Sequence, residues 1–317
     1  MTTNEYVERA RAHATSWKDH CMPELAGTAA PYMTAHGPRG RYQHCLPPAR
    51  AAENLLPAVR DEALGYFTAH EIRWQASVEG GPSNHLLSSQ VQCVNALAPM
   101  VRDPERIVRA FGAVLDVAEP LEIEPARLVA FEHIGAVDHL GEVPRGPRRR
   151  GAMTTSADAA IRYRTSTGII EIALIEWKYT EDCRATELEP SRFDRLSRYR
   201  PLVDRDDCPI RFDAIPYEDV FVEPFYQLFR QQLLAHEMER ARELDADRVR
   251  VVHVSPVGNV ALRTALHRDS HRRAGGDVFD IWRSMLCSPD RFVCLDSALF
   301  CDRHVTSDAY VARYGHD

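Results

Sequence analysis

The chain has 317 residues, 44% hydrophobic and 27% charged, a composition typical of a globular protein with a substantial core. Its formal net charge of −7 gives no general reason to expect affinity for nucleic acid, although a local basic loop could still attract phosphates. No segment approaches about 18 uninterrupted apolar residues and the N-terminus lacks a secretion-signal pattern, so we expect a cytoplasmic protein without membrane spans.

Residues 1–82 are expected to form an N-terminal helical extension. Helices are predicted over residues 4–21 and 49–67, with a stretch rich in Pro and Gly between them. Two histidines and two cysteines of this segment can be combined into a metal site on paper, but four such common residues carry little information. They are His20, Cys21, His44 and Cys45. We interpret the segment as an accessory region.

The eight cysteines are scattered, without the close CxxC pairs of a zinc ribbon. A reducing compartment would leave them as thiols, which usually behave as small buried hydrophobes. Cys287, Cys294 and Cys301 recur at regular intervals before His304, but this spacing matches no standard zinc pattern. Most of the cysteines are therefore predicted to fill the core.

Beyond a Gly-Gly-Pro breaker, helices are predicted over residues 83–97 and 104–115, followed by a short strand over 127–135. A loop over residues 144–151 then joins this strand to the next. It consists entirely of two prolines, two glycines and four arginines, which are Arg145, Arg148, Arg149 and Arg150. Such a loop either contacts a phosphate backbone or is simply solvated.

Two strands joined by the polar turn 164–168 carry the strongest chemical signal. The first contains Asp158, and the second, over residues 169–179, is dense in β-branched and aromatic residues. Because side chains alternate along a strand, Glu176 and Lys178 share one face near its end. Buried charges at such a place require pairing, solvation or a metal ion.

The remaining elements complete a mixed pattern. Residues 188–216 are predicted as a polar connection, and residues 222–244 as the clearest helix of the chain. A strand over residues 248–254 follows. A helix over 278–287 and a strand over 291–295 are expected to add a closing α+β layer.

The order of these elements, with Asp158 on one strand and Glu176-Trp177-Lys178 on the next, resembles the PD-(D/E)XK nuclease superfamily. The superfamily signature is an acidic residue on the second core strand and an acidic residue, any residue and a lysine on the third. More narrowly, four segments are similar to a largely uncharacterised family of predicted restriction endonucleases. They are residues 88–90, 155–159, 176–181 and 226–234, and the resemblance covers roughly residues 84–300.

The resemblance implies an α/β fold with a restriction-endonuclease-like αβββαβ core, a mixed central sheet flanked by helices. This core would span residues 83–256, between the N-terminal extension and a C-terminal α+β addition over 257–317. The rival interpretation is a non-catalytic nucleic-acid-binding or scaffold module that retains the fold. The intact set of acidic residues and lysine argues against it.

The implied activity is that of a Mg²⁺-dependent endonuclease that hydrolyses phosphodiester bonds, most readily in DNA, with a role in restriction or defence. Asp158, Glu176 and the backbone carbonyl of Trp177 would hold Mg²⁺, for which Mn²⁺ can substitute. Lys178 would place its ammonium near the attacking water or the developing negative charge. A homodimer is expected because cleavage of both strands often uses symmetry.

The superfamily often has a further acidic residue on its first core helix, but residues 88–97 contain none. Gln90 stands there instead. Glu132, on the preceding strand, is the nearest alternative carboxylate, although it could equally face solvent. Gln227 and Gln231 could orient substrate or the ion site, or could form an ordinary polar stripe on their helix.

Overall fold

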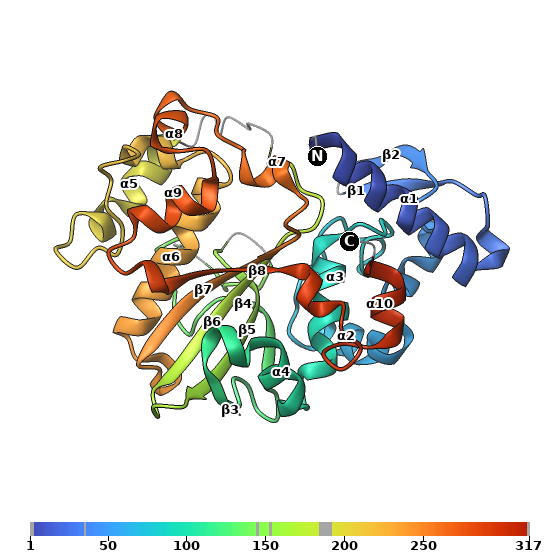
Figure 1. The fold of residues 1–317 in the computed structure, drawn as a ribbon, viewed down its shortest axis with the longest axis horizontal. Helices are drawn as coiled ribbons and strands as arrows, with labels where there is room; N and C mark the ends of the chain where they lie inside the picture. Colours follow the sequence, from blue (N-terminus) through green and yellow to red (C-terminus); the bar gives the residue numbers. More distant parts are fainter. Residues whose placement is uncertain (1–2, 35, 144–145, 152–153, 184–191, 316–317) are drawn as a thin grey trace.

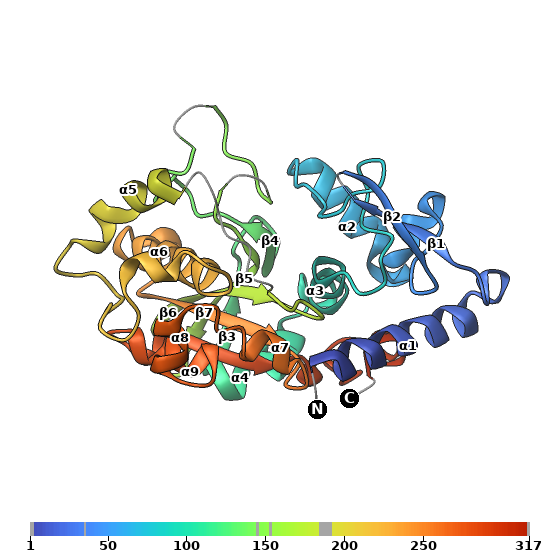
Figure 2. The same ribbon diagram turned by 90° about the horizontal axis from the view of Figure 1, so that it is seen from above.

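The computed structural model describes residues 3–34, 36–143, 146–151, 154–183 and 192–315. A six-stranded sheet runs through the molecule (Figure 1), and helices pack on both of its faces (Figure 2). The strands are β3 (Val117–Leu121), β4 (Val129–His133), β5 (Ala157–Thr165), β6 (Ile170–Trp177), β7 (Arg248–Ser255) and β8 (Phe292–Asp296).

Their pairing makes the sheet mixed. Both β3 and β4 pair antiparallel with β5, and β5 pairs antiparallel with β6. The strands β6, β7 and β8 run parallel. The predicted α/β class with a mixed sheet between helices is confirmed, whereas β3, which contains Pro120, was not predicted.

The β5–β6 hairpin forms as predicted and lies at the centre of the sheet. Its register pairs Arg164 with Ile170 and Ala159 with Ile175. Lys178 lies one residue beyond the end of β6, where its N–H still donates to the carbonyl of Val254 at 2.8 Å. Backbone pairing with β7 therefore fixes the position of the end of β6, where Glu176 and Lys178 lie.

One face of the sheet is covered by α6 (Phe225–Arg240), α9 (Val278–Met285) and α5 (Arg192–Val203), with the short helices α7 (Val260–Arg263) and α8 (Asp269–Ala274) beside them (Figure 1). Helix α5 contradicts the polar connection predicted there, whose first residues, 188–191, lie outside the described part. Leu196, Tyr199 and Val203 recur at helical spacing and pack on the apolar cluster of this face, although charged residues outnumber them.

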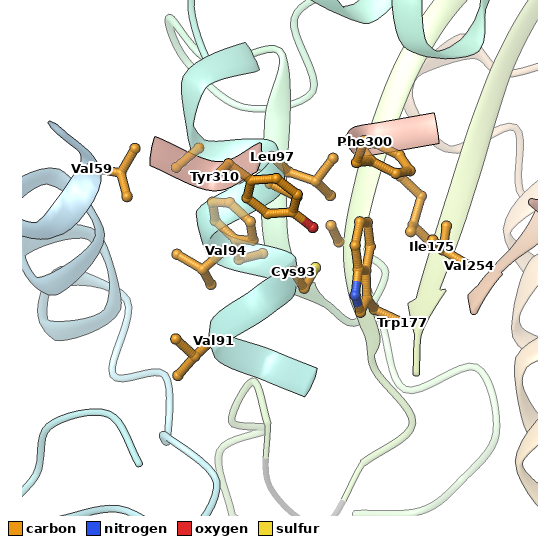
Figure 3. Packing of buried hydrophobic residues seen from close by; sticks show 14 of the residues in the cluster. Val59, Val91, Cys93, Val94, Leu97, Ile175, Trp177, Val254, Phe300 and Tyr310 are labelled. Atoms are coloured by element: carbon orange, nitrogen blue, oxygen red, sulfur yellow. The ribbon is translucent and has the colours of Figure 1, made fainter. Parts of the chain in front are cut away.

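The other face is covered by α3 (Ser89–Leu97), α4 (Pro104–Leu115) and α10 (Asp308–Tyr314). Figure 3 shows the indole of Trp177 between β6 and α3, close to Cys93, Phe300 and Tyr310. Trp177 is completely buried, and its Nε1–H donates to Gln92 on α3 at 2.9 Å. This contact anchors α3 to the strand that carries Glu176.

The N-terminal segment belongs to the same apolar cluster. Helix α1 (Thr3–Cys21) is confirmed and contacts α10. The single helix predicted over residues 49–67 is wrong, because Pro57 starts a new helix, α2 (Pro57–Ala69), after a 3₁₀ segment at Pro48–Asn54. The preceding stretch contains an unpredicted hairpin of β1 (Ala30–Thr34) and β2 (Gly37–Tyr42).

Among the residues described, none of the helices combines the length and the apolar character that crossing a bilayer requires.

Candidate active site

A polar cavity of about 300 Å³ lies at the end of β6, between α3 and α6. Seven of the residues around it carry its charge and most of its hydrogen-bonding capacity: Glu132, Asp158, Glu176, Lys178, Glu181, Gln227 and Arg230. Five of these were singled out from the sequence. The fold therefore brings side chains from β4, β5, β6 and α6 to one place.

Glu176 is the most completely bonded of these carboxylates and is only 2% exposed. Lys178 and Gln227 both donate to its Oε1, the latter at 2.5 Å, and Gln231 donates to its Oε2. The two glutamines reach one carboxylate because they lie one turn apart on α6. The Glu176–Lys178 contact confirms that these residues share a face.

Asp158 is held beside Glu176 by the backbone. Its Oδ2 accepts the N–H of Trp177 at 2.7 Å, so the carboxyl lies next to the peptide group that follows Glu176. Burial and the neighbouring Glu176 raise the pKa of Asp158 well above its usual value, with Lys178 opposing them. Two carboxyl groups in one cavity therefore disfavour each other's charge in the absence of a further cation.

Lys178 supplies the positive charge next to these two groups. Burial lowers the pKa of Lys178, but the carboxylates of Glu176 and Asp158 outweigh it and raise this pKa above its ordinary value. The side chain is therefore an ammonium near neutral pH. In this state it can stabilise negative charge but cannot accept a proton.

Glu132 faces the cavity rather than solvent and is also 2% exposed. Its φ of +48°, unusual for a glutamate in a strand, turns its side chain out of the regular β4 pattern. Gln90 donates to its Oε1 at 2.7 Å, and Ser156 donates to its Oε2 at 2.9 Å. Burial and then Glu176 raise its pKa, while these two hydrogen bonds oppose the shift.

Two features of the cavity were missed at the sequence level. Arg230 donates to Thr155 at 3.1 Å and lies 3.9 Å from Glu142. Arg230 lies between Gln227 and Gln231 on the same helix, and this position in the sequence could have identified it as a residue of the site.

The second feature of the cavity that was missed at the sequence level is Gly151, whose φ of +70° favours glycine. A Cβ there would lie 3.0 Å from the carbonyl oxygen of Arg73 and 3.4 Å from the Glu132 carboxyl group. Because Gly151 has no side chain, its backbone can lie closer to the Glu132 carboxyl group than the backbone of any other residue type could.

The arginine-rich loop divides into bonded and exposed side chains. The guanidinium of Arg148 donates to four consecutive backbone carbonyls, those of residues 134–137. Arg150 pairs with Glu124 at 2.6 Å. Arg149 has a side chain that is 62% exposed, with a carboxylate no closer than 3.9 Å. Arg145 lies outside the described residues.

Comparison with known proteins gives one result. Residues 11–315 match the model of a family described as "Restriction Endonuclease associating with ARP". Searches of curated proteins and of solved structures gave no match.

Proposed function

The chain belongs to the restriction endonuclease family that it matches over residues 11–315, and on this premise we propose that it is a Mg²⁺-dependent endonuclease acting on DNA through a PD-(D/E)XK site. The observation that carries the proposal is the cavity at the end of β6, where Asp158 and Glu176 converge beside the ammonium of Lys178. The family description also names an association with ARP, and we include that association in the proposal.

The donor groups suit Mg²⁺. Asp158, Glu176 and the backbone carbonyl of Trp177 offer hard oxygen ligands, and Mg²⁺ is usually held by one or two carboxylates together with water and substrate phosphate. Burial, and after it Glu176, raise the pKa of Asp158, and a bound cation would favour its charged form. A bound divalent ion would supply Lewis-acid activation of water and of the phosphoryl group.

The protein side chains would position the reacting groups. Gln227 and Gln231 hold the Glu176 carboxylate in one orientation, and the N–H of Trp177 does the same for Asp158. Lys178, as an ammonium, would stabilise the charge that develops on the phosphoryl oxygens. Arg230 borders the same cavity and would meet the flanking phosphate.

Among the described arginines of the basic loop, Arg149 is the strongest candidate for contact with the DNA backbone, because its charge is exposed whereas Arg148 and Arg150 are bonded within the protein. Cleavage of both strands would require a second active site, and a homodimer would supply it.

The proposal is tested by cleavage of supercoiled plasmid and of single-stranded DNA in Mg²⁺ or Mn²⁺. We expect metal-dependent cutting that disappears in Asp158→Ala and Lys178→Ala and persists in Asp245→Ala, a matched change whose side chain is 88% exposed. DNA binding in Ca²⁺, followed by fluorescence anisotropy, should survive in all three variants. Binding without cleavage by the wild type would instead favour the non-catalytic module.

A further inference from the structure

Two histidines and a cysteine converge outside the cavity of the proposed nuclease site, whose lining includes none of them. His44 and Cys45 follow β2, and His85 precedes α3. One ligand atom from each of the three side chains lies within 4.8 Å of the others. Among the residues described, this is the one group of three or more His, Cys, Asp or Glu side chains that close together, and Cys287, Cys294, Cys301 and His304 form no such group.

We propose that His44, Cys45 and His85 bind one zinc ion that fastens the N-terminal extension to the segment leading into α3. The pair predicted from sequence as unpromising, His44 and Cys45, is completed by a residue 40 positions further along the chain rather than by His20 or Cys21.

The backbone around the three side chains is held by hydrogen bonds from both segments. Cys45 and His85 face each other in an antiparallel bridge, in which Leu46 N–H donates to Asn84 O at 2.9 Å and Leu86 N–H donates to His44 O at 3.1 Å. The fully buried Asn84 side chain also donates to Leu46 O at 2.7 Å. The ligands are therefore presented by a rigid bridge rather than by mobile loops, as a preformed metal site requires.

The ring and thiol geometry requires only small adjustments for metal binding. The imidazole centroids of His44 and His85 lie 4.9 Å apart and nearly perpendicular, so both rings can direct a nitrogen to one point. Ligand atoms of a tetrahedral zinc ion are roughly 3.3–3.6 Å apart, so movements of the three ligand atoms by about 1 Å would bring them to zinc-binding distances. The hydrogen bond from Leu87 N–H to His85 Nδ1, at 3.2 Å, would be given up on binding.

The ligand types select the metal. A thiolate and two imidazoles suit Zn²⁺, whereas Mg²⁺ and Ca²⁺ prefer oxygen ligands. Three protein ligands leave one coordination position for water. His44 also lines a surface cavity with Glu8 and Asp19 of α1.

Such an ion would act on the fold rather than on DNA. His85 lies five positions before Gln90, whose side chain donates to Glu132 in the nuclease cavity. Zinc would thus join the N-terminal extension to the helix that borders this cavity. The zinc proposal is independent of the nuclease proposal, because its ligands do not include Asp158 or Glu176.

The test is the zinc content of the full-length, untagged protein, expressed with zinc and dialysed against metal-free buffer. We expect about one zinc per chain in the wild type and in Cys21→Ser, a matched change of an exposed cysteine at the end of α1. Cys45→Ser and His85→Asn should each lower the content by about fivefold or more. Full retention of zinc in both ligand variants, or a wild type that binds none, would overturn the proposal.

Cobalt substitution tests the site in the wild-type protein, so its result does not depend on whether the ligand variants fold. Wild-type protein loaded with Co²⁺ should show the near-ultraviolet charge-transfer band of a cobalt–thiolate bond, and Cys21→Ser should show the same band. Zinc should also raise the thermal midpoint of the metal-free wild type, because an ion that binds only the folded state stabilises it. Absence of both the band and the shift in well-folded wild type would contradict the site.

Discussion

Strand β6 buries two glutamates, one near each end, in opposite electrostatic environments. Glu171, fully buried, lies 2.9 Å from Arg248 and 2.8 Å from Arg250, and it accepts the hydroxyl of Tyr163 at 2.8 Å. Its single negative charge therefore faces two guanidinium groups.

Glu176 faces one ammonium and two neutral amides. Around the same cavity, Asp158, Glu132 and Glu181 add three carboxyl groups against the single guanidinium of Arg230. Burying a carboxylate without full compensation is costly, so a purely structural site would resemble that of Glu171. An excess of negative charge that opens into a cavity is typical of a functional site that binds a cation. Replacing Glu171 therefore serves as the control for replacing Glu176, because both glutamates are buried on the same strand.

The largest expected effect is on cleavage by Glu176→Gln. This change preserves shape but removes a metal-binding charge, so we expect the cleavage rate to fall by about 1000-fold or more. Single-turnover plasmid cleavage at saturating Mg²⁺ measures it. Glu171→Gln, the matched change on the same strand, should cleave at the wild-type rate per folded molecule, and equal losses in the two variants would remove the distinction between them.

The second effect is a loss of stability when Glu171 is replaced. Glu171→Gln leaves Arg248 and Arg250 without their buried counter-charge, and we expect the free energy of unfolding to fall by about 3 kcal/mol. Urea denaturation followed by circular dichroism measures this loss. A variant as stable as the wild type would show that the pairing is energetically unimportant.

Asp158→Asn should change stability in the opposite direction when metal is absent. The neutral amide oxygen can still accept the Trp177 N–H, while the charge that burial and Glu176 disfavour is removed. We expect a gain of about 1 kcal/mol in EDTA, and no such gain for the exposed control Asp245→Asn. Destabilisation by Asp158→Asn would mean that Lys178 already compensates both carboxylates.

The smallest effect concerns the arginines, which divide in the same way as the glutamates. Arg149→Ala should weaken DNA binding a few-fold and reduce the salt slope of the binding constant by about one ion, because its side chain is 62% exposed and lies 3.9 Å from the exposed carboxylate of Glu71. Arg102→Ala, with a side chain 66% exposed, is the control. An unchanged salt slope in Arg149→Ala would show that Arg149 does not contact the DNA backbone.

Local sequence pattern was sufficient for the central hairpin and its charges. Two-residue periodicity places Glu176 and Lys178 on one face whatever surrounds the strand, and β-branched density marks β6 as buried. The helix predicted from residue 83 begins only at Ser89, where Ser88 caps it, but the apolar spacing of α6 follows from the same short-range geometry. These features depend on neighbours within a few positions, so they can be read directly from the chain.

Contacts between distant segments required the folded structure. Packing of α6 on β6 decided that Gln227 and Gln231 both reach Glu176, and a left-handed backbone turned Glu132 inward. The bridge between residues 45 and 85 completed a His–Cys–His group that no local spacing encodes. Such contacts depend on chain closure and on the packing of whole elements, and no short window of sequence contains that information.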